Sequence, residues 1–139
     1  MKTLLRLVMA LAVMMGVTAG PAMAGDKDPL FINLTVDDAH RVDMAVTFGK
    51  KQLERGHPLT IFLNDRGVLV GSTANATAFA DQRKALEEVI GQGATVIVCP
   101  MCMKHYGVKE TDLMPGLKIG SPDLTGPALF QDDTKTLTW

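Results

Sequence analysis

Residues 94–102, Ala94-Thr95-Val96-Ile97-Val98-Cys99-Pro100-Met101-Cys102, decide the fold class of this chain. The first five are apolar or β-favouring without alternation, which is typical of a strand covered on both faces, as in a parallel sheet. Two earlier segments, residues 30–34 and 59–63, have the same character. The sequence therefore predicts three buried parallel strands.

Amphipathic segments separate these strands. A helix is expected from Asp37 or Asp38, either of which can cap it, to about residue 55, where Gly56 ends it. A second helix is expected over about residues 76–90. The residues expected to face inward are Val42, Val46, Gly49 and Leu53 on the first helix, and Phe79, Leu86, Val89 and Ile90 on the second.

Beyond residue 107 the pattern is weaker. Residues 117–119 suit a short fourth strand, a helical segment is expected through about residues 121–130, and residues 134–139 alternate like a strand at a sheet edge. Strands that alternate with helices indicate right-handed βαβ units. We therefore predict a three-layer α/β/α fold with a mainly parallel sheet of about five strands.

The first 24 residues have the pattern of an export signal. Lys2 and Arg6 precede an apolar run over residues 7–17, and Ala22-Met23-Ala24 offers small residues for cleavage before Gly25. The run is too short to span a bilayer, which takes roughly 20 apolar residues. We expect residues 1–24 to be removed and residues 25–139 to form one domain. This short leader favours the periplasm of a bacterium as the compartment.

The charge of residues 25–139 excludes some partners. Without Lys2 and Arg6, 12 basic residues face 15 acidic ones, which gives a net charge of −3. There is no basic stripe, so nucleic acid is not an expected partner. No later segment is long and apolar enough to predict a membrane span.

Cys99 and Cys102 are the strongest candidates for chemistry. Thiol pairs in exported proteins tend to form disulfides, but a loop this short stabilises a fold little. Cys99 ends a predicted strand and Pro100 suits the first turn of a helix, so we expect Cys99 at a helix N-terminus that favours its thiolate form. Cys102 lies one turn later, close enough to resolve a species on Cys99, and His105 can assist proton transfer.

The end of the second predicted strand supplies two further candidates. Ligands of open parallel sheets bind beyond the carboxyl ends of the strands, and Asn64 and Asp65 stand at such an end. We assign them as candidate ligand-binding residues, although Asp65 also suits a turn. Neither a dinucleotide-binding glycine motif nor a P-loop is present in the sequence.

Two segments resemble the DsrE/DsrF-like family: residues 93–108, which hold the cysteine at a strand end followed by a short helix and Gly107-Val108, and residues 61–68. The resemblance covers about residues 29–139. It implies a small α/β protein with a largely parallel five-stranded sheet that assembles as a homo- or hetero-oligomer, often a trimer or hexamer. It also implies that Cys99 carries a persulfide and exchanges sulfur with a donor or acceptor protein or a small sulfur species. Cys102 inherits no role from it.

The leading hypothesis is therefore sulfur handling by Cys99 with Cys102 as a resolving thiol, and whether the protein is an enzyme stays open. A second hypothesis is a Cu(I)-binding protein, since thiolate, thioether and imidazole groups lie within seven residues. Its ligands would be Cys99, Met101, Cys102, Met103 and His105. Thiol–disulfide exchange is a third hypothesis, and an oligomeric binding module with a structural disulfide is a fourth.

Overall fold

A computed structural model of the chain describes Gly25 and residues 27–139, so the predicted leader, residues 1–24, lies outside the described residues. The described part has four α-helices and a five-stranded sheet in the order β4-β3-β2-β1-β5, and every strand pair is parallel. The elements are β1 (Leu30–Leu34), α2 (Ala39–Glu54), β2 (Leu59–Leu63), η1 (Asp65–Leu69), η2 (Thr73–Asn75), α3 (Ala80–Gly91), β3 (Thr95–Val98), α4 (Pro100–Tyr106), η3 (Glu110–Asp112), β4 (Lys118–Ile119), α5 (Pro122–Phe130) and β5 (Lys135–Thr138).

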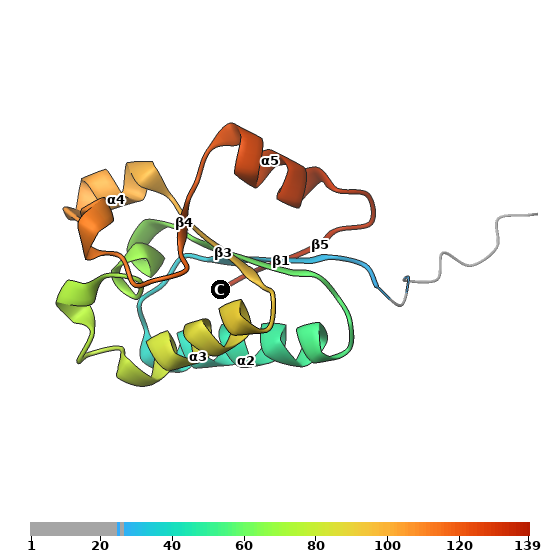
Figure 1. Ribbon diagram of the computed structural model, residues 1–139, viewed down its shortest axis with the longest axis horizontal. Coiled ribbons are helices and arrows are strands. Elements are labelled where there is room, and N and C mark those ends of the chain that lie inside the picture. The colour runs from blue at the N-terminus through green and yellow to red at the C-terminus, as the bar shows by residue number, and fades with distance from the viewer. Residues whose placement is uncertain (1–24, 26) are drawn as a thin grey trace, which may run out of the picture.

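Helices cover both faces of the sheet. Helices α2 and α3 lie side by side on one face, and α5 lies over the other (Figure 1). The predicted α/β class and the five-stranded parallel sheet are confirmed. Within the described residues, no helix combines the length and the apolar character that crossing a membrane requires.

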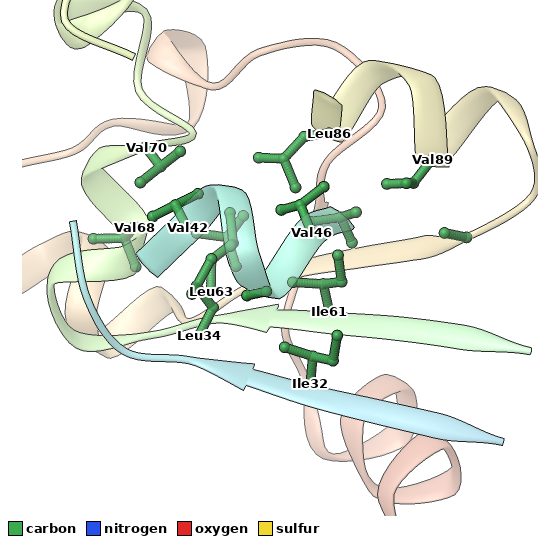
Figure 2. Close-up of a cluster of buried hydrophobic side chains, with 14 of the residues drawn as sticks. Ile32, Leu34, Val42, Val46, Ile61, Leu63, Val68, Val70, Leu86 and Val89 are labelled. Atoms are coloured by element: carbon green, nitrogen blue, oxygen red, sulfur yellow. The ribbon is translucent and has the colours of Figure 1, made fainter. Parts of the chain in front are cut away.

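The main core lies between the sheet and the pair α2 and α3 (Figure 2). Alternate residues of β1 and β2 point into it and are almost fully buried, and side chains of both helices meet them there. The side chains labelled in the figure are Ile32, Leu34, Val42, Val46, Ile61, Leu63, Val68, Val70, Leu86 and Val89. Burial of such aliphatic side chains contributes roughly 1.5–3 kcal/mol each.

Helix α2 follows the predicted pattern. The Asp38 carboxylate accepts the N–H of Arg41 at 2.9 Å and caps the helix. On its inner face, Gly49 lets the helix approach the sheet, because a Cβ there would lie 2.9 Å from the Cδ1 atom of Ile32. Gly56, with φ of 95°, follows the helix end.

Helix α3 differs from the expectation. It begins at Ala80 rather than near residue 76, because the short helix η2 and a turn occupy the preceding residues. Ser72 caps η2 through the N–H of Ala74. The inner face of α3 also buries Gln82, which donates to a carboxylate oxygen of Asp43 on α2 at 2.9 Å. A buried polar residue such as Gln82 cannot be recognised from the pattern of apolar residues in the sequence.

The opposite face of the sheet presents aromatic and aliphatic side chains. Phe31 on β1 and Ile97 on β3 are buried, and Phe62 on β2 lies between them in the strand order. The rings of Phe31 and Phe62 are 6.3 Å apart between centroids. This face leads to the carboxyl ends of β2 and β3, where the candidate site lies.

Candidate functional site

The parallel register brings the predicted site residues together. Leu63 on β2 pairs with Val98 on β3, so the residues that follow both strands emerge at the same edge of the sheet. An open pocket of about 540 Å³ lies there. It is lined by Phe62, Asn64, Asp65, Cys99, Met101, Cys102, His105 and Tyr106. All five residues predicted as catalytic or ligand-binding therefore share one pocket.

The backbone of Cys99 belongs both to the end of the sheet and to the start of helix α4. Its N–H donates to the carbonyl of Leu63 at 2.9 Å, which extends the β2–β3 ladder by one residue. It then serves as the N-cap of α4, with Pro100 in the first turn, as predicted. Gly107, in the left-handed conformation with φ of 71°, ends this helix.

The Cys99 sulfur differs from the expectation in one respect. Among the described residues it accepts no capping hydrogen bond from the N–H groups of α4. Pro100 removes one of the donors that a helix N-terminus normally supplies. The partner of the Cys99 side chain is instead the Cys102 side chain, and both cysteines are thiols rather than a disulfide in the described structure.

Three polar groups act on Cys102: the Cys99 thiol, the backbone N–H of Asp65 and the Asp65 carboxylate. Partial burial raises the pKa of its thiol most, and the hydrogen bond with Cys99 raises it further. The backbone N–H of Asp65 acts in the opposite direction, since it stabilises the thiolate, while the Asp65 carboxylate repels it. Burial and the contact with Cys99 therefore both favour the protonated form of the Cys102 thiol.

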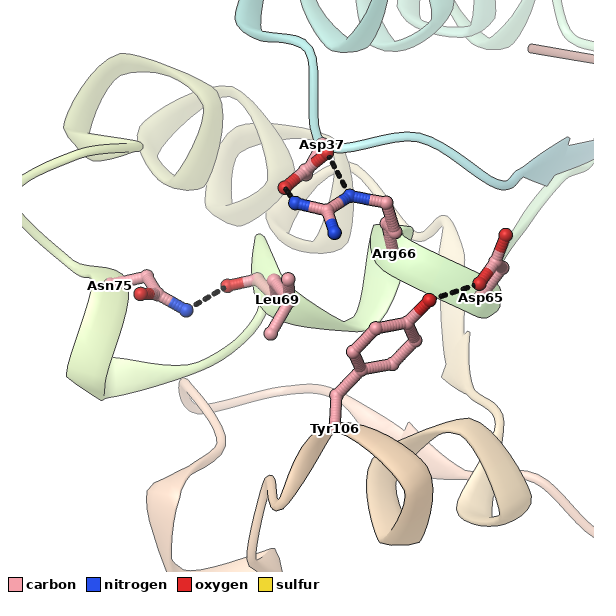
Figure 3. A network of polar contacts seen from close by, with 6 residues as sticks. All are labelled: Asp37, Asp65, Arg66, Leu69, Asn75 and Tyr106. Carbon is pink, nitrogen blue, oxygen red and sulfur yellow. Dashed lines mark hydrogen bonds and ion pairs between the residues drawn. The ribbon is translucent and has the colours of Figure 1, made fainter.

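Tyr106 is a member of the site that the sequence interpretation missed. Its hydroxyl donates to the Asp65 carboxylate at 2.5 Å (Figure 3), and this bond is the largest cause of the raised pKa of Tyr106. Tyr106 lies four residues after Cys102 on α4, and residues at this spacing share a helix face. That spacing is the signal that could have identified it.

The helix η1, which begins at Asp65, is bound to the segment that follows β1. Arg66 binds both carboxylate oxygens of Asp37, with Nε–Oδ1 at 2.8 Å and Nη2–Oδ2 at 2.6 Å (Figure 3). This pairing holds the pKa of Asp37 below its ordinary value. Gly67 is buried against the carbonyl of Leu34, where a Cβ would overlap the oxygen.

Asn64 lies on the same edge of the sheet. Its side-chain amide donates to the side-chain carbonyl of Asn33, which follows Ile32 on β1. This contact orients the Asn64 amide beside the pocket that holds both cysteines. Its predicted role in ligand binding is untested and stays a prediction.

His105 and the two methionines take different positions. His105 is exposed at the pocket and contacts the Tyr106 ring edge-to-face, with centroids 4.7 Å apart. Met101 is 80% exposed beside the pocket, whereas Met103 is 4% exposed and packs in the main core. The donor set considered for Cu(I) thus loses Met103. Across the described residues, no three His, Cys, Asp or Glu side chains gather as metal ligands would.

A second, more apolar pocket lies on the α5 side of Cys99. It measures about 260 Å³ and shares Phe62, Cys99 and Met101 with the first. Its other lining residues are Pro100, Gly120, Ser121, Pro122 and Thr125. Cys99 is therefore reachable from two sides.

Fold and site together define a small parallel α/β protein with a thiol pair at the carboxyl end of a central strand. The chain belongs to the DsrE/DsrF-like family, whose sequence profile matches residues 28–130. The family resemblance inferred from the two sequence segments is thereby confirmed.

Two archaeal relatives are similar in sequence. An uncharacterized protein of Methanocaldococcus jannaschii is 34% identical over 82 residues, which span 58% of this chain and 72% of the relative. An uncharacterized protein of Methanopyrus kandleri is 32% identical over 82 residues, which span 58% of this chain and 68% of the relative.

Solved structures share the fold at low identity. A protein of unknown function from Methanobacterium thermoautotrophicum superposes with a TM-score of 0.65 at 15% identity, over 80% of this chain and 98% of that one. The ychN protein from E. coli superposes with a TM-score of 0.60 at 17% identity, over 81% of this chain and 99% of that one. A conserved protein of unknown function from Bacteroides thetaiotaomicron superposes with a TM-score of 0.63 at 21% identity, over 85% of this chain and 99% of that one.

Proposed function

We propose that this protein handles sulfane sulfur, with Cys99 as the persulfide carrier and Cys102 as the resolving thiol. The observation that carries the proposal is the pair itself: two free thiols that lie close together at the carboxyl end of β3, in a pocket open to solvent. Membership of the DsrE/DsrF-like family supports it, because sulfur relay is the general activity of this family.

Loading of Cys99 would be a nucleophilic displacement at sulfur. The Cys99 thiolate attacks the terminal sulfur of a donor R–S–SH, the new S–S bond forms at Cys99, and the S–S bond of the donor breaks. The leaving thiolate R–S⁻ takes up a proton. Cys99 is suited to this step because it lies at the wall of both pockets and the donor can approach from either one.

The bound sulfur can then leave in two ways. An acceptor thiolate that attacks the outer sulfur takes it and returns Cys99 as a thiolate. Alternatively, the Cys102 sulfur attacks the Cys99 sulfur, which forms the Cys99–Cys102 disulfide and expels the outer sulfur as hydrogen sulfide with the Cys102 proton. A dithiol reductant must then supply two electrons to reopen the disulfide.

Mass spectrometry after exposure of the reduced protein to inorganic polysulfide tests this function. We expect the peptide that holds Cys99 to gain the mass of one sulfur atom. The Cys102→Ser variant keeps the pocket and lacks the resolving thiol, so it should hold the added sulfur longer than the wild type.

The matched variant Cys99→Ser should take up no sulfur under the same conditions. Uptake on Cys102 alone, or an unmodified Cys99 peptide in both wild type and Cys102→Ser, would contradict the proposal. Release of sulfide together with appearance of the Cys99–Cys102 disulfide would assign the resolving route rather than relay to an acceptor.

We further propose that residues 1–24 are a cleaved export signal and that the protein works in a bacterial periplasm. The basic start, the apolar run over residues 7–17 and the small residues before Gly25 support this proposal. Intact-mass measurement of protein recovered from the periplasmic fraction should give a chain that begins at Gly25. A full-length chain in the cytoplasmic fraction would contradict it.

A further inference from the structure

Asp65 connects the thiol pair to the rest of the pocket in an unusual backbone conformation. Its φ of 43° lies in the left-handed region, which non-glycine residues adopt rarely. Such a conformation persists when surrounding contacts impose it. Two of these contacts are made by the residues that follow Asp65 in sequence. Arg66 forms two hydrogen bonds with Asp37, and Gly67 packs closely against the Leu34 carbonyl.

The third contact comes from α4. The Tyr106 hydroxyl donates to the Asp65 carboxylate at 2.5 Å, and α4 packs directly on η1. In this position the backbone N–H of Asp65 reaches the Cys102 sulfur. Asp65 thus receives a hydrogen bond from α4 through its side chain, and its main-chain N–H lies close enough to Cys102 of the same helix to favour the thiolate.

The two groups of Asp65 act on Cys102 in opposite directions. The N–H stabilises a Cys102 thiolate, whereas the carboxylate destabilises it by charge repulsion. The Tyr106 hydroxyl donates a hydrogen bond to that carboxylate, which reduces its repulsion of a Cys102 thiolate and fixes the position of the carboxylate. The other ionisable side chains that line this pocket are Cys99 and His105, and Arg66, which follows Asp65 in sequence, is paired with Asp37.

We infer that Asp65 and Tyr106 are positioning residues for the resolving step, in which they hold the Asp65 N–H on the Cys102 sulfur while that sulfur attacks persulfidated Cys99. The inference rests on the proposed function, and it adds the groups that make Cys102 reactive. In the step itself the Cys99–Cys102 bond forms, the bond from Cys99 to the outer sulfur breaks, and the outer sulfur leaves with the Cys102 proton as hydrogen sulfide.

Tyr106→Phe is the decisive variant, because it keeps the ring and removes only the hydroxyl. We expect it to slow release of hydrogen sulfide from polysulfide-loaded protein by about tenfold, the effect of one hydrogen bond to a charged group. Loading of Cys99 should keep its wild-type rate. Lys104→Ala, an exposed change on the same helix that does not line the pocket, should leave both rates unchanged.

Substitution of Asp65 separates its backbone from its side chain. Asp65→Gly adopts a left-handed φ without strain and keeps the N–H, so it should retain most of the release rate. Because Tyr106 acts through Asp65, adding Tyr106→Phe to Asp65→Gly should cause no further loss. A full tenfold loss in that double variant would overturn the inference.

A second readout does not require persulfide chemistry. In a Cys99→Ser background, the pH profile of Cys102 alkylation reports the Cys102 thiolate directly, and Tyr106→Phe should move its midpoint to higher pH. An unmoved midpoint would overturn the positioning role. If Cys99 takes up no sulfur at all, the proposed function fails, while this profile still decides the role of Asp65 and Tyr106.

Discussion

At the scale of single residues, the thiol pair and the short helix η1 depend on one another. Besides its contact with Cys99, Cys102 interacts with the N–H and the carboxylate of Asp65, and the position of Asp65 depends on the residues that follow it. Gly67 is the tightest of these, since it lies against backbone rather than against a movable side chain. The anchoring of η1 should therefore be visible in the stability of the protein.

Gly67→Ala should destabilise the protein by about 2 kcal/mol or more, in the range of overpacked buried sites. The added Cβ would overlap the carbonyl oxygen of Leu34, which belongs to a central strand and cannot move freely. Gly71→Ala is the matched control, because its Cβ would meet the Leu117 side chain at 2.7 Å, and that side chain can rotate. Urea unfolding of both variants measures the difference. Equal losses would contradict this account.

The Asp37–Arg66 pair should make stability depend on pH in the acid range. The pKa of Asp37 is held below its ordinary value of 3.8, so the folded state binds the Asp37 proton less well than the unfolded state does. The pair therefore stabilises the fold above that ordinary value, and its contribution is lost as the pH falls through the lowered pKa.

Asp37→Asn removes this dependence and should be less stable than the wild type near neutral pH. Because Arg66 is half exposed, the difference should be small and should shrink in high salt. Urea unfolding at a series of pH values should show the two stability curves converging toward acid. Curves that stay parallel would show that the pair contributes no pH dependence.

At the scale of elements, helix α2, which contributes Val42, Ala45 and Val46 to the core, depends on its N-cap. Asp38→Ala removes the carboxylate that accepts the Arg41 N–H at 2.9 Å, and should cost about 1 kcal/mol. Asp38→Asn keeps an oxygen in the same place and should cost only a fraction of that. Thermal unfolding of the two variants compares them, and an equal loss would assign the effect to charge rather than to capping.

Most of the elements could be predicted from the sequence, because local patterns determine them. The continuous apolar runs indicate the three central strands, and the two candidate caps, Asp37 and Asp38, indicate the start of α2 within two residues, Asp38 being the cap that forms. The start of α3 was placed about four residues too early. There the chain forms a short 3-10 helix whose cap residue, Ser72, also bridges to Leu113, a tertiary contact that no local pattern specifies.

The candidate site was predictable in position more than in composition. Parallel strands place Asn64, Asp65 and Cys99 at one edge by necessity, since their carboxyl ends coincide. The hydrogen bond from Tyr106 to Asp65 spans 41 positions and depends on how α4 packs on η1, which no local pattern specifies. The different burial of Met101 and Met103 likewise depends on the orientation of that short helix.

At the scale of the whole molecule, an exposed apolar patch lies far from the thiol pair in sequence. Met44 and Phe48 on the outer side of α2 are 51% and 41% exposed, and Trp139 packs on Phe48 with ring centroids 5.9 Å apart. Leu137 on the edge strand β5 is exposed as well. Large contiguous apolar patches on a protein surface mark interaction sites. We propose this patch as a contact between copies of the chain in a homo-oligomer, as the family often forms.

Phe48→Glu should therefore convert the proposed homo-oligomer, for which the family resemblance implies a trimer or hexamer, into a monomer. The carboxylate would be buried without a partner at the contact, which is costly. Phe130→Glu is the matched control, since Phe130 is 81% exposed on α5, away from the patch. Light scattering on a sizing column gives the mass of each. A native chain that is monomeric, or a Phe130→Glu variant that dissociates equally, would contradict the proposal.

The pairing of β1 with β5 has a consequence for the order in which the chain folds. Thr35 and Trp139, whose backbone and side-chain bonds close this pair, are separated by 104 positions. The neighbouring pairs β1–β2 and β2–β3 join much nearer segments, and nearer segments meet with a smaller loss of chain entropy. We expect β5 to dock last, so that nascent molecules expose the apolar β1 as a bare edge. That interval is when these molecules are most prone to aggregate.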